Sequence, residues 1–223
     1  RVLFRSHHIF IYLLGDIAFV PLEVLLVTLI IHQLLERRER RDKLHKLNMA
    51  IGVFFAELGT DLLRRFLEWD ANAENLPQLA NVEKDWDRKA FDQAQARLLT
   101  AWKPQLSGID DALPQLYRFL NEKRGLLLNL LGNANLLEHE AFTDLLWAVF
   151  HLLDELSHRP DLTRLSATDL QHLRGDAERA YGRLMAGWLR YMEYLQADYP
   201  YLFSLALRSS PFADRTTAAV TES

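Results

Sequence analysis

The sequence has no cysteine and few helix-interrupting residues, with 9 glycines and 7 prolines among 223 residues. Without cysteine the chain forms no disulfide, performs no thiolate chemistry and has no cysteine-ligated metal site. The glycine-rich motifs of P-loop and dinucleotide-binding proteins and the G-x-S-x-G motif of hydrolases are also missing. The sequence therefore carries no recognisable motif for nucleotide hydrolysis, acyl transfer or thiol catalysis. It predicts no cofactor and favours a non-enzymatic protein.

One long apolar run dominates the start of the chain, between Ile9 and Leu35. From Ile17 to Leu35 its mean hydropathy is about 2, which is typical of transmembrane helices. A helix rises about 1.5 Å per residue, so this stretch nearly crosses the hydrocarbon core of a bilayer. We therefore predict a single transmembrane helix within residues 7–36. Residues 1–6, RVLFRS, match a translated sequencing adapter and are treated as foreign to the protein.

Two carboxylates lie within the predicted anchor. Asp16 and Glu23 are seven residues apart and therefore share a helix face, with Val27 on the same side and Pro21 between them. An acid near the bilayer centre costs about 2.5–3.5 kcal/mol and usually faces protein or water. We predict a contact between anchor helices at Asp16, Pro21, Glu23 and Val27. One alternative is a proton- or ion-sensitive site, and the other places Asp16 among lipid headgroups with Glu23 protonated.

The flank of the apolar run sets the predicted orientation. A basic segment, residues 37–46, follows directly, and nothing comparable precedes the run. The positive-inside rule then places the C-terminal part in the cytoplasm, which predicts a single-pass protein of the bacterial inner membrane. Nucleic acid is not an expected partner, because the whole chain has a net charge of −4. Membrane lipid is an expected partner of the basic side chains, which are Arg37, Arg38, Arg40, Arg41, Lys43 and Lys46.

Apolar residues recur at helical spacing through residues 47–208. The predicted fold class is therefore all-α, with the anchor followed by a cytoplasmic bundle of about five helices. The expected helical stretches are residues 44–69, 82–103, 109–131, 137–157 and 168–198, with a short terminal helix over 199–207. Ser166 or Thr168 would cap the longest of them. Residues 209–223 are polar and are predicted to be disordered.

The helix predicted over residues 137–157 has acidic and histidine residues on its polar face, opposite a broad apolar face. The polar residues that share this face are Glu140, Asp144, His151, Glu155 and His158, with Trp147 among them. We interpret the face mainly as a solvated or partner-facing surface. Trp147, Asp144 and His151 form its predicted partner-contacting part, because exposed aromatic residues often anchor interfaces.

A metal site is the alternative interpretation of the same face. Helical Glu-x-x-His is one component of a carboxylate-bridged di-metal site, and Glu155 with His158 fits that spacing. The low-probability metal ligands are Glu140, His151, Glu155 and His158. Such a site needs a second Glu-x-x-His helix, however. Two similar motifs occur elsewhere in the sequence, at residues 42–45 and 169–172, and both have Asp in place of Glu.

Three segments resemble a known family: KLNMAIGVFFAELGTDLL (46–63), LLEHEAFTDLLWAVFHLLDELS (136–157) and YPYLFSLALRSSPF (199–212). The chain resembles bacterial membrane-anchored all-helical proteins with no assigned activity, over nearly its whole length from Ile9. The resemblance implies an architecture and an inner-membrane location. It transfers no functional residue.

The function predicted from these features is that of a membrane-anchored helical adaptor or signalling scaffold. Such a protein would act through protein–protein contacts with an unidentified partner. It would self-associate through Asp16, Glu23 and the helix that continues over 44–69. The alternatives are a metal-dependent helical enzyme and an accessory subunit of a membrane transport system.

Overall fold

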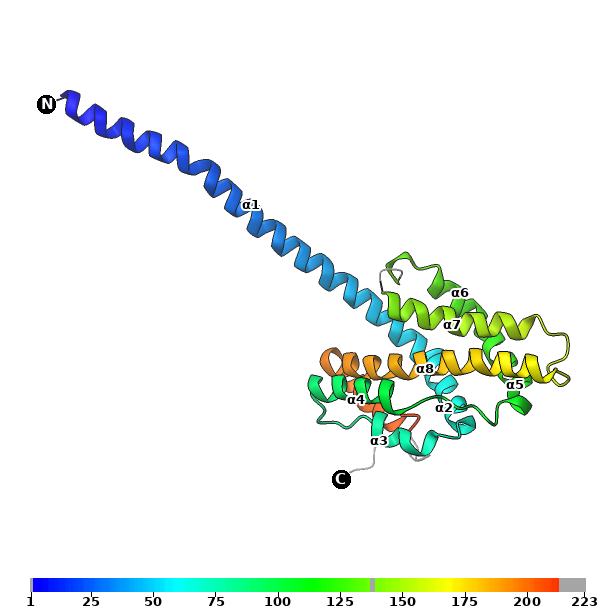
Figure 1. The fold of residues 1–223 in the computed structure, drawn as a ribbon. Coiled ribbons are helices and arrows are strands. Elements are labelled where there is room, and N and C mark those ends of the chain that lie inside the picture. The colour runs from blue at the N-terminus through cyan, green and yellow to red at the C-terminus, as the bar shows by residue number, and fades with distance from the viewer. Residues whose placement is uncertain (1, 137–138, 213–223) are drawn as a thin grey trace. The chain divides into compact units, whose positions relative to one another are not determined.

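The computed structural model describes residues 2–136 and 139–212, with side chains for Phe19 and from Glu23 onward except Asn135. The described chain is helical throughout, as the sequence predicted (Figure 1). Its α-helices are α1 (Val2–Phe54), α2 (Thr60–Trp69), α3 (Leu76–Ala80), α4 (Arg88–Ala101), α5 (Leu113–Glu122), α6 (Arg124–Leu131), α7 (Glu140–Ser157), α8 (Ala167–Asp198) and α9 (Pro200–Arg208). Shorter turns are the π-turn η1 (Phe55–Gly59) and the 3-10 turns η2 (Ala73–Asn75), η3 (Asp110–Ala112) and η4 (Ala134–Leu136).

The chain divides into two units, Arg1–Lys46 and Leu47–Ser223. The prediction of about five helices after the anchor is too low, because eight α-helices follow α1 within the described residues. The stretch predicted over 109–131 is two helices. They are separated at Lys123, whose backbone angles of φ −96° and ψ 5° leave the helical region. A short helix, α3, also forms in the segment between the predicted first and second helices.

The predicted transmembrane anchor is wrong. No helix in the part of the chain that the structure describes is long and apolar enough to cross a membrane. The apolar run Val24–Leu35 stands between two carboxylates, Glu23 and Glu36. These twelve residues rise about 18 Å as a helix, against about 30 Å for a bilayer core. The predicted inner-membrane location and orientation depended on this anchor and are not supported. The lipid-facing role predicted for residues 37–46 depended on it as well.

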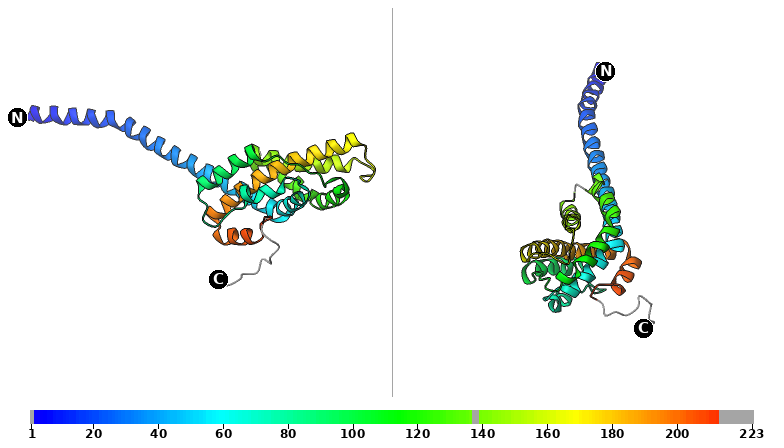
Figure 2. Two further views of the ribbon diagram at one scale, coloured as in Figure 1. Left: turned by 60° about the horizontal axis from the view of Figure 1, so that its bottom comes forward. Right: turned by 90° about the vertical axis from the view of Figure 1, so that its right-hand side faces the viewer.

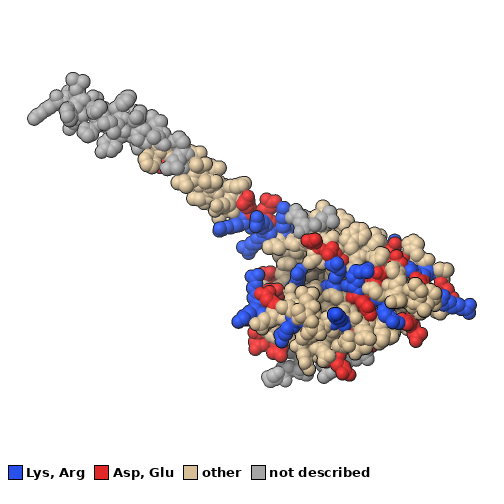
Figure 3. Space-filling view, viewed as in Figure 1, with Lys and Arg blue, Asp and Glu red and all other residues tan. Residues whose placement is uncertain are grey.

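The four residues predicted to join anchor helices fall into two groups. The side chains of Asp16 and Pro21 lie outside the described residues. Glu23 and Val27 are described and are exposed on α1. The predicted basic residues of 37–46 are exposed or half-buried on the same helix. Figure 3 shows acidic side chains standing among the basic ones there, and both signs interspersed over the visible face of the second unit.

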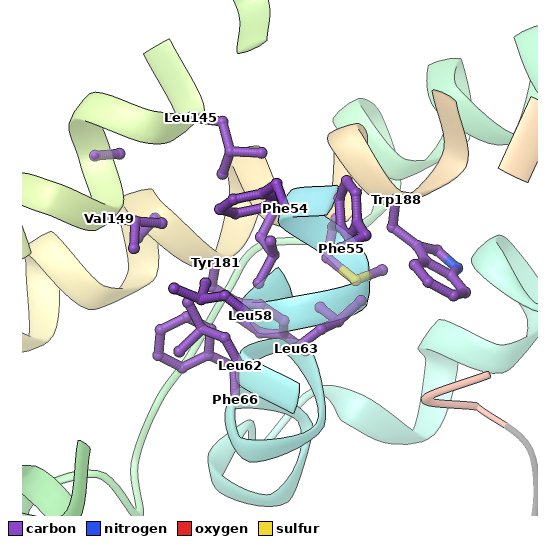
Figure 4. Packing of buried hydrophobic residues seen from close by; sticks show 14 of the residues in the cluster. Phe54, Phe55, Leu58, Leu62, Leu63, Phe66, Leu145, Val149, Tyr181 and Trp188 are labelled. Atoms are coloured by element: carbon purple, nitrogen blue, oxygen red, sulfur yellow. The ribbon is translucent and has the colours of Figure 1, made fainter. Parts of the chain in front are cut away.

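The core of the second unit is built around the helical stretch predicted over 44–69. Phe54, Leu58 and Phe66, at helical spacing in this stretch, and Phe55 beside them are fully buried and pack against α7 and α8 (Figure 4). The π-turn η1 interrupts the predicted continuous helix. Because a π-turn accommodates one extra residue, the side of the helix that faces the core shifts by one position there. Gly59 is needed within it, because an added Cβ would lie 2.6 Å from Cδ1 of the Phe55 ring. The turn therefore lets two consecutive phenylalanines enter the core.

Helices α7 and α8 form an antiparallel hairpin, joined by residues 158–166, and lie side by side along their length (Figures 1 and 2). Both were predicted to within three residues of their observed ends. Ser166 caps α8, because its hydroxyl accepts a hydrogen bond from the backbone N–H of Asp169 at 3.2 Å. Leu152 and Leu153 of α7 and Leu173 and Ala177 of α8 are fully buried. This packing fixes the register in which the polar residues of the two helices meet.

Candidate metal centre

Two histidine–carboxylate pairs face each other across the α7–α8 hairpin, close to its connecting loop. Each pair has i, i+4 spacing, which places both members on one face of their helix. Helix α7 contributes His151 and Glu155, and α8 contributes His172 and Asp176. Because the helices run antiparallel, His151 lies opposite Asp176 and Glu155 lies opposite His172. We call these four residues the α7–α8 cluster.

The donor atoms of the α7–α8 cluster lie close together. The Nε2 atom of His172 is 3.4 Å from Oε2 of Glu155 and 3.4 Å from Oδ2 of Asp176. The Nε2 atom of His151 is 3.4 Å from the same Asp176 oxygen and 4.0 Å from Oε1 of Glu155. Glu155, His172 and Asp176 each offer a donor atom within 4.8 Å of the other two. These three form the inner set, and His151 stands beside them.

Asp176 lies at the floor of the cluster. Its side chain is 2% exposed, while Glu155 is 28%, His151 48% and His172 53% exposed. Its Oδ1 accepts a hydrogen bond from Nη1 of Arg179 at 2.7 Å. Its Oδ2 is buried and has no hydrogen-bond partner among the described residues. A buried carboxylate oxygen is costly when it is left unpaired, so an electropositive group on this oxygen would stabilise the fold.

Arg159 supports the cluster from the connecting loop. Its guanidinium donates to Oε2 of Glu155 at 2.6 Å and to Oδ1 of Asp169 at 2.7 Å. The hydrogen bond from Arg159 holds the pKa of the Glu155 carboxyl below its usual value, against the opposing effect of partial burial. The hydrogen bond to Asp169 in turn raises the pKa of Arg159. Glu155 is therefore held ionised and fixed in orientation.

The charge balance favours a cation. Three carboxylates, those of Glu155, Asp169 and Asp176, face two guanidinium groups, those of Arg159 and Arg179. One negative charge is in excess when both imidazoles are neutral. Neutral imidazole nitrogens and ionised carboxylates are the donor forms that bind divalent metals. With protonated imidazoles the same four residues would instead form an ion-pair network that ties α7 to α8.

The spacing of the donors identifies the kind of metal that fits. Zinc binds imidazole nitrogen and carboxylate oxygen at about 2.0–2.2 Å, so two ligand atoms of a tetrahedral site stand about 3.3–3.5 Å apart. Both histidine nitrogens lie 3.4 Å from Oδ2 of Asp176, and His172 lies 3.4 Å from Oε2 of Glu155, while His151 is 4.0 Å from Oε1 of Glu155. An octahedral magnesium site at about 2.0–2.1 Å would bring neighbouring ligands to about 3 Å and prefers oxygen. The α7–α8 cluster therefore suits a tetrahedral first-row transition metal.

The ligand set predicted from sequence is only partly brought together. His151 and Glu155 lie in the α7–α8 cluster, but Glu140 lies at the first residue of α7 and is exposed. His158 is 73% exposed, and its Nδ1 contacts the backbone oxygen of Asp154 at 2.8 Å. The similar Asp42–His45 motif lies in the first unit, whereas the α7–α8 cluster lies in the second.

The predicted partner surface is divided by the structure. Asp144 accepts a hydrogen bond from Arg183 of α8 at 2.5 Å, and His151 belongs to the cluster. Trp147 is 53% exposed and meets the Phe150 ring edge-on, with 6.1 Å between centroids. That Trp147 contacts a protein partner stays a prediction.

Sequence reasoning missed His172 and Asp176 as partners of His151 and Glu155. Both pairs were visible as i, i+4 spacings, and both predicted helices flank a short connection. Short connections join antiparallel neighbours, so pairs at similar distances from the loop come to lie opposite each other. Pairing the two helices about residues 158–166 would have found the cluster.

Comparison with known proteins identifies the family. A family model described as "Uncharacterized protein MJ1433, C-terminal helical domain" matches residues 43–208, and one described as "MJ1433, N-terminal helical domain" matches residues 2–35. The chain belongs to the MJ1433 family. A relative from Methanocaldococcus jannaschii, "Uncharacterized protein MJ1433", is 42% identical over 212 residues, which cover 95% of this chain and 85% of the relative. No solved structure matches the chain.

Membership of the MJ1433 family confirms that the chain belongs to an uncharacterised family of helical proteins. The predicted bacterial origin of that family is not supported, because the relative comes from an archaeon. Membrane anchoring is not supported either, for the reason given above. All four residues of the α7–α8 cluster lie within the matched range 43–208.

Proposed function

We propose that this MJ1433-family protein binds one first-row transition-metal dication, best matched by Zn²⁺, between α7 and α8. Glu155, His172 and Asp176 supply the ligands, and His151 is the fourth donor. The observation that carries the proposal is Oδ2 of Asp176, which is buried without a hydrogen-bond partner and lies 3.4 Å from Nε2 of both histidines. A metal ion at this point would pair that oxygen and balance the excess negative charge.

The position of His151 separates two roles for the ion. With His151 bound, four protein ligands close the site, and the metal ties the two helices of the hairpin together as structural zinc does. With His151 displaced, three ligands would leave a fourth position open to water, and a zinc ion there would lower the pKa of bound water. The half-exposed imidazoles support a fourth position near the protein surface.

The test is metal binding by the purified full-length chain after treatment with a chelator. Calorimetric titration with Zn²⁺ is expected to give one site per chain, and Co²⁺ is expected to give the visible absorption of a tetrahedral complex. Asp176→Asn is expected to lose both signals, and His172→Ala is expected to weaken them. His158→Ala is the matched control, because it removes an exposed histidine next to the same loop. Absence of a stoichiometric site, or unchanged binding in Asp176→Asn, would overturn the proposal.

We propose, as a second function, that the protein self-associates as a scaffold through the first unit. Nine large apolar side chains of α1 are each 49–60% exposed, and they are Val24, Leu25, Leu26, Val27, Leu29, Ile30, Ile31, Leu34 and Leu35. Isolated helices rarely expose such a continuous apolar surface to water. A second copy of this segment is the occupant that we propose for that surface. The flanking charges are compatible with it, because both signs alternate there and pair within the helix, as Glu39 and Lys43 do at 3.2 Å.

The absence of cysteine makes self-association directly measurable. Val27→Cys would carry the only thiol in the chain, and oxidation is expected to yield a covalent dimer of the full-length protein. Leu128→Cys is the control, because Leu128 is a similarly exposed apolar residue of α6. Ile30→Lys is expected to lower the mass measured by light scattering. A monomer at every concentration tested, or equal crosslinking at Val27 and Leu128, would contradict this function.

A further inference from the structure

The α7–α8 cluster holds three donors close together and a fourth less closely. Glu155, His172 and Asp176 form the inner set. Nε2 of His151 lies 4.0 Å from Oε1 of Glu155, and the His151 side chain is 48% exposed. A tetrahedral ion with three inner ligands keeps a fourth position that a small ligand can take. The charges and the open surface around this position select its occupant.

A divalent ion reverses the charge of the cluster. Without metal, the three carboxylates in and beside the cluster exceed the two guanidinium groups by one charge. A divalent ion turns this excess into one positive charge while both imidazoles are neutral. The ion is then the largest local charge, and it attracts an anion to its fourth position.

Arg179 is the cationic side chain available to such an anion. Its Nη1 donates to Oδ1 of Asp176 at 2.7 Å, which is the one hydrogen bond of this guanidinium to the described residues. The side chain is 56% exposed and can be reached from solvent. Arg159, by contrast, is 15% exposed and divides its guanidinium between Glu155 and Asp169. Arg179 therefore has N–H groups to offer to a ligand.

Asp176 shows that one carboxylate spans the distance from Arg179 to the metal position. Its Oδ1 accepts the hydrogen bond from Arg179, and its Oδ2 is the oxygen proposed to bind the ion. A carboxylate of a ligand has the same reach. It can bridge the ion and the guanidinium from the exposed side, with one oxygen on each. Guanidinium groups favour such paired contacts with carboxylates.

Gly175 leaves the surface of α8 open beside these groups. It lies three residues after His172 and four before Arg179, so the three residues share one face of the helix. A Cβ added at Gly175 would meet no atom within 4 Å. Glycine is unfavourable in a helix interior, so helix stability does not explain its presence there. The open surface gives a ligand room between His172 and Arg179.

The size of the charge selects a carboxylate among the common anions. One negative charge balances the single positive excess of the loaded site. A phosphate monoester carries about −1.5 to −2 at neutral pH, which would place surplus negative charge beside Glu155 and Asp176. An uncharged oxygen ligand would leave the positive charge unbalanced.

We propose that the metal site proposed above, once loaded, binds the carboxylate of a small monocarboxylic acid at its fourth position. One carboxylate oxygen coordinates the ion in place of His151, and the other accepts a hydrogen bond from Arg179. The body of the acid lies over the open surface at Gly175.

The probe is acetate, titrated into the full-length protein loaded with Co²⁺ in a buffer free of carboxylate and phosphate. Acetate is expected to change the visible spectrum of the bound Co²⁺ with one-to-one stoichiometry. It is expected to bind at least tenfold more tightly than acetamide, its uncharged counterpart, and more tightly than methyl phosphate.

The outcomes separate this inference from the metal site on which it rests. Bound Co²⁺ whose spectrum stays unchanged in saturating acetate would overturn the inference and leave the metal site standing. Tighter binding of methyl phosphate than of acetate would do the same. A spectrum that changes with protein concentration before any acid is added would show that a carboxylate of a second copy fills the position, which also overturns it. Failure of Co²⁺ to bind would overturn both proposals.

Two variants are expected to change the acetate affinity in opposite directions at saturating Co²⁺. His151→Ala removes the competing imidazole and is expected to strengthen acetate binding at least threefold, although it weakens metal binding. Arg179→Gln is expected to weaken acetate binding at least tenfold. Arg183→Gln is the matched control, because Arg183 also lies on α8, is 42% exposed and pairs with Asp144. Weaker acetate binding in His151→Ala, or equal losses in the two arginine variants, would overturn the proposal.

Gly175→Leu tests where the body of the acid lies. It is expected to weaken the binding of benzoate at least tenfold and that of acetate less, because the larger acid needs the open surface. Gly125→Leu is the control, since Gly125 is a helical glycine of α6 that also meets nothing within 4 Å. Equal benzoate affinity in the two variants would overturn the placement over Gly175.

Discussion

Two histidine–aspartate pairs with the same spacing lie on either side of the α7–α8 loop, and they differ sharply in surroundings. His172 and Asp176 lie within the hairpin, with the aspartate 2% exposed and the donor atoms 3.4 Å apart. Asp154 and His158 lie at the end of α7, where they are 44% and 73% exposed and 3.9 Å apart. The first pair faces Glu155 across the hairpin. The second pair has only its own helix.

The comparison shows that i, i+4 spacing supplies two donors but not a site. A metal ion needs further ligands, partial exclusion of water and outer partners that hold the ligands in place. The opposing helix supplies the ligands for His172 and Asp176, and Arg159 with Arg179 supplies the outer partners. Water solvates the other pair instead. Four predictions separate the two situations, beginning with the largest expected effect.

Asp176→Asn is expected to abolish specific metal binding, because it removes the negative charge at the buried floor of the cluster while keeping the side-chain shape. Zinc at about 100 times the dissociation constant should stabilise the parent by about 2.7 kcal/mol. We expect this gain in the free energy of unfolding to disappear in the variant, as measured by denaturation with and without Zn²⁺. If Zn²⁺ stabilised the parent and Asp176→Asn equally, the His172–Asp176 pair would bind metal no better than the exposed Asp154–His158 pair.

His172→Ala is expected to weaken Zn²⁺ binding on the order of 100-fold, since the loss of a ligand exceeds the 10–100-fold effect typical of outer partners. His151→Ala should cost about tenfold, because His151 lies outside the inner set of three donors. Competition with a chromophoric chelator measures both constants. A larger effect at His151 than at His172 would mean that the ion lies nearer to α7 than proposed.

Arg159→Gln is expected to weaken Zn²⁺ binding about tenfold without changing the one-to-one stoichiometry. The guanidinium holds Glu155 and Asp169 together, and its removal frees Glu155 to rotate away from His172. Arg164→Gln serves as the control, because Arg164 is 87% exposed and pairs with Asp161 of the same loop. Equal losses in the two variants would indicate a general effect of charge rather than orientation.

His158→Ala is expected to leave the Zn²⁺ affinity within twofold of the parent value. Its imidazole is exposed, and its polar partners among the described residues are Ser157 and Asp154 of its own helix. The same competition assay measures it. A loss comparable to that of His172→Ala would restore the Glu155–His158 site that the sequence suggested as an alternative.

The sequence predicted long amphipathic helices well and short ones poorly. The helix predicted over 168–198 is observed as Ala167–Asp198, since a long stripe and a serine cap both specify its start. The helix predicted over 82–103 begins later, at Arg88, where the Asp87 side chain accepts a hydrogen bond from the N–H of Ala90. Caps of this kind set helix ends more closely than apolar periodicity does.

The predicted anchor shows where hydropathy misleads. A window average gives every residue equal weight and counted apolar residues back to Ile17. Within the described side chains the apolar run ends after Leu35, and His32 and Gln33 already interrupt it. Apolar composition identifies a surface that must be covered, but it does not identify what covers it.

The sequence by itself determined the helical class, the positions of the long helices and the polar face of α7, because these follow from local periodicity and capping. Only the tertiary structure decided that His151 and Glu155 meet His172 and Asp176, and that Asp176 is buried with one oxygen that accepts no hydrogen bond from the described residues. The reason is physical. Spacing along one helix fixes which side chains share a face, whereas packing of the apolar faces of α7 and α8 fixes which faces meet and at what register.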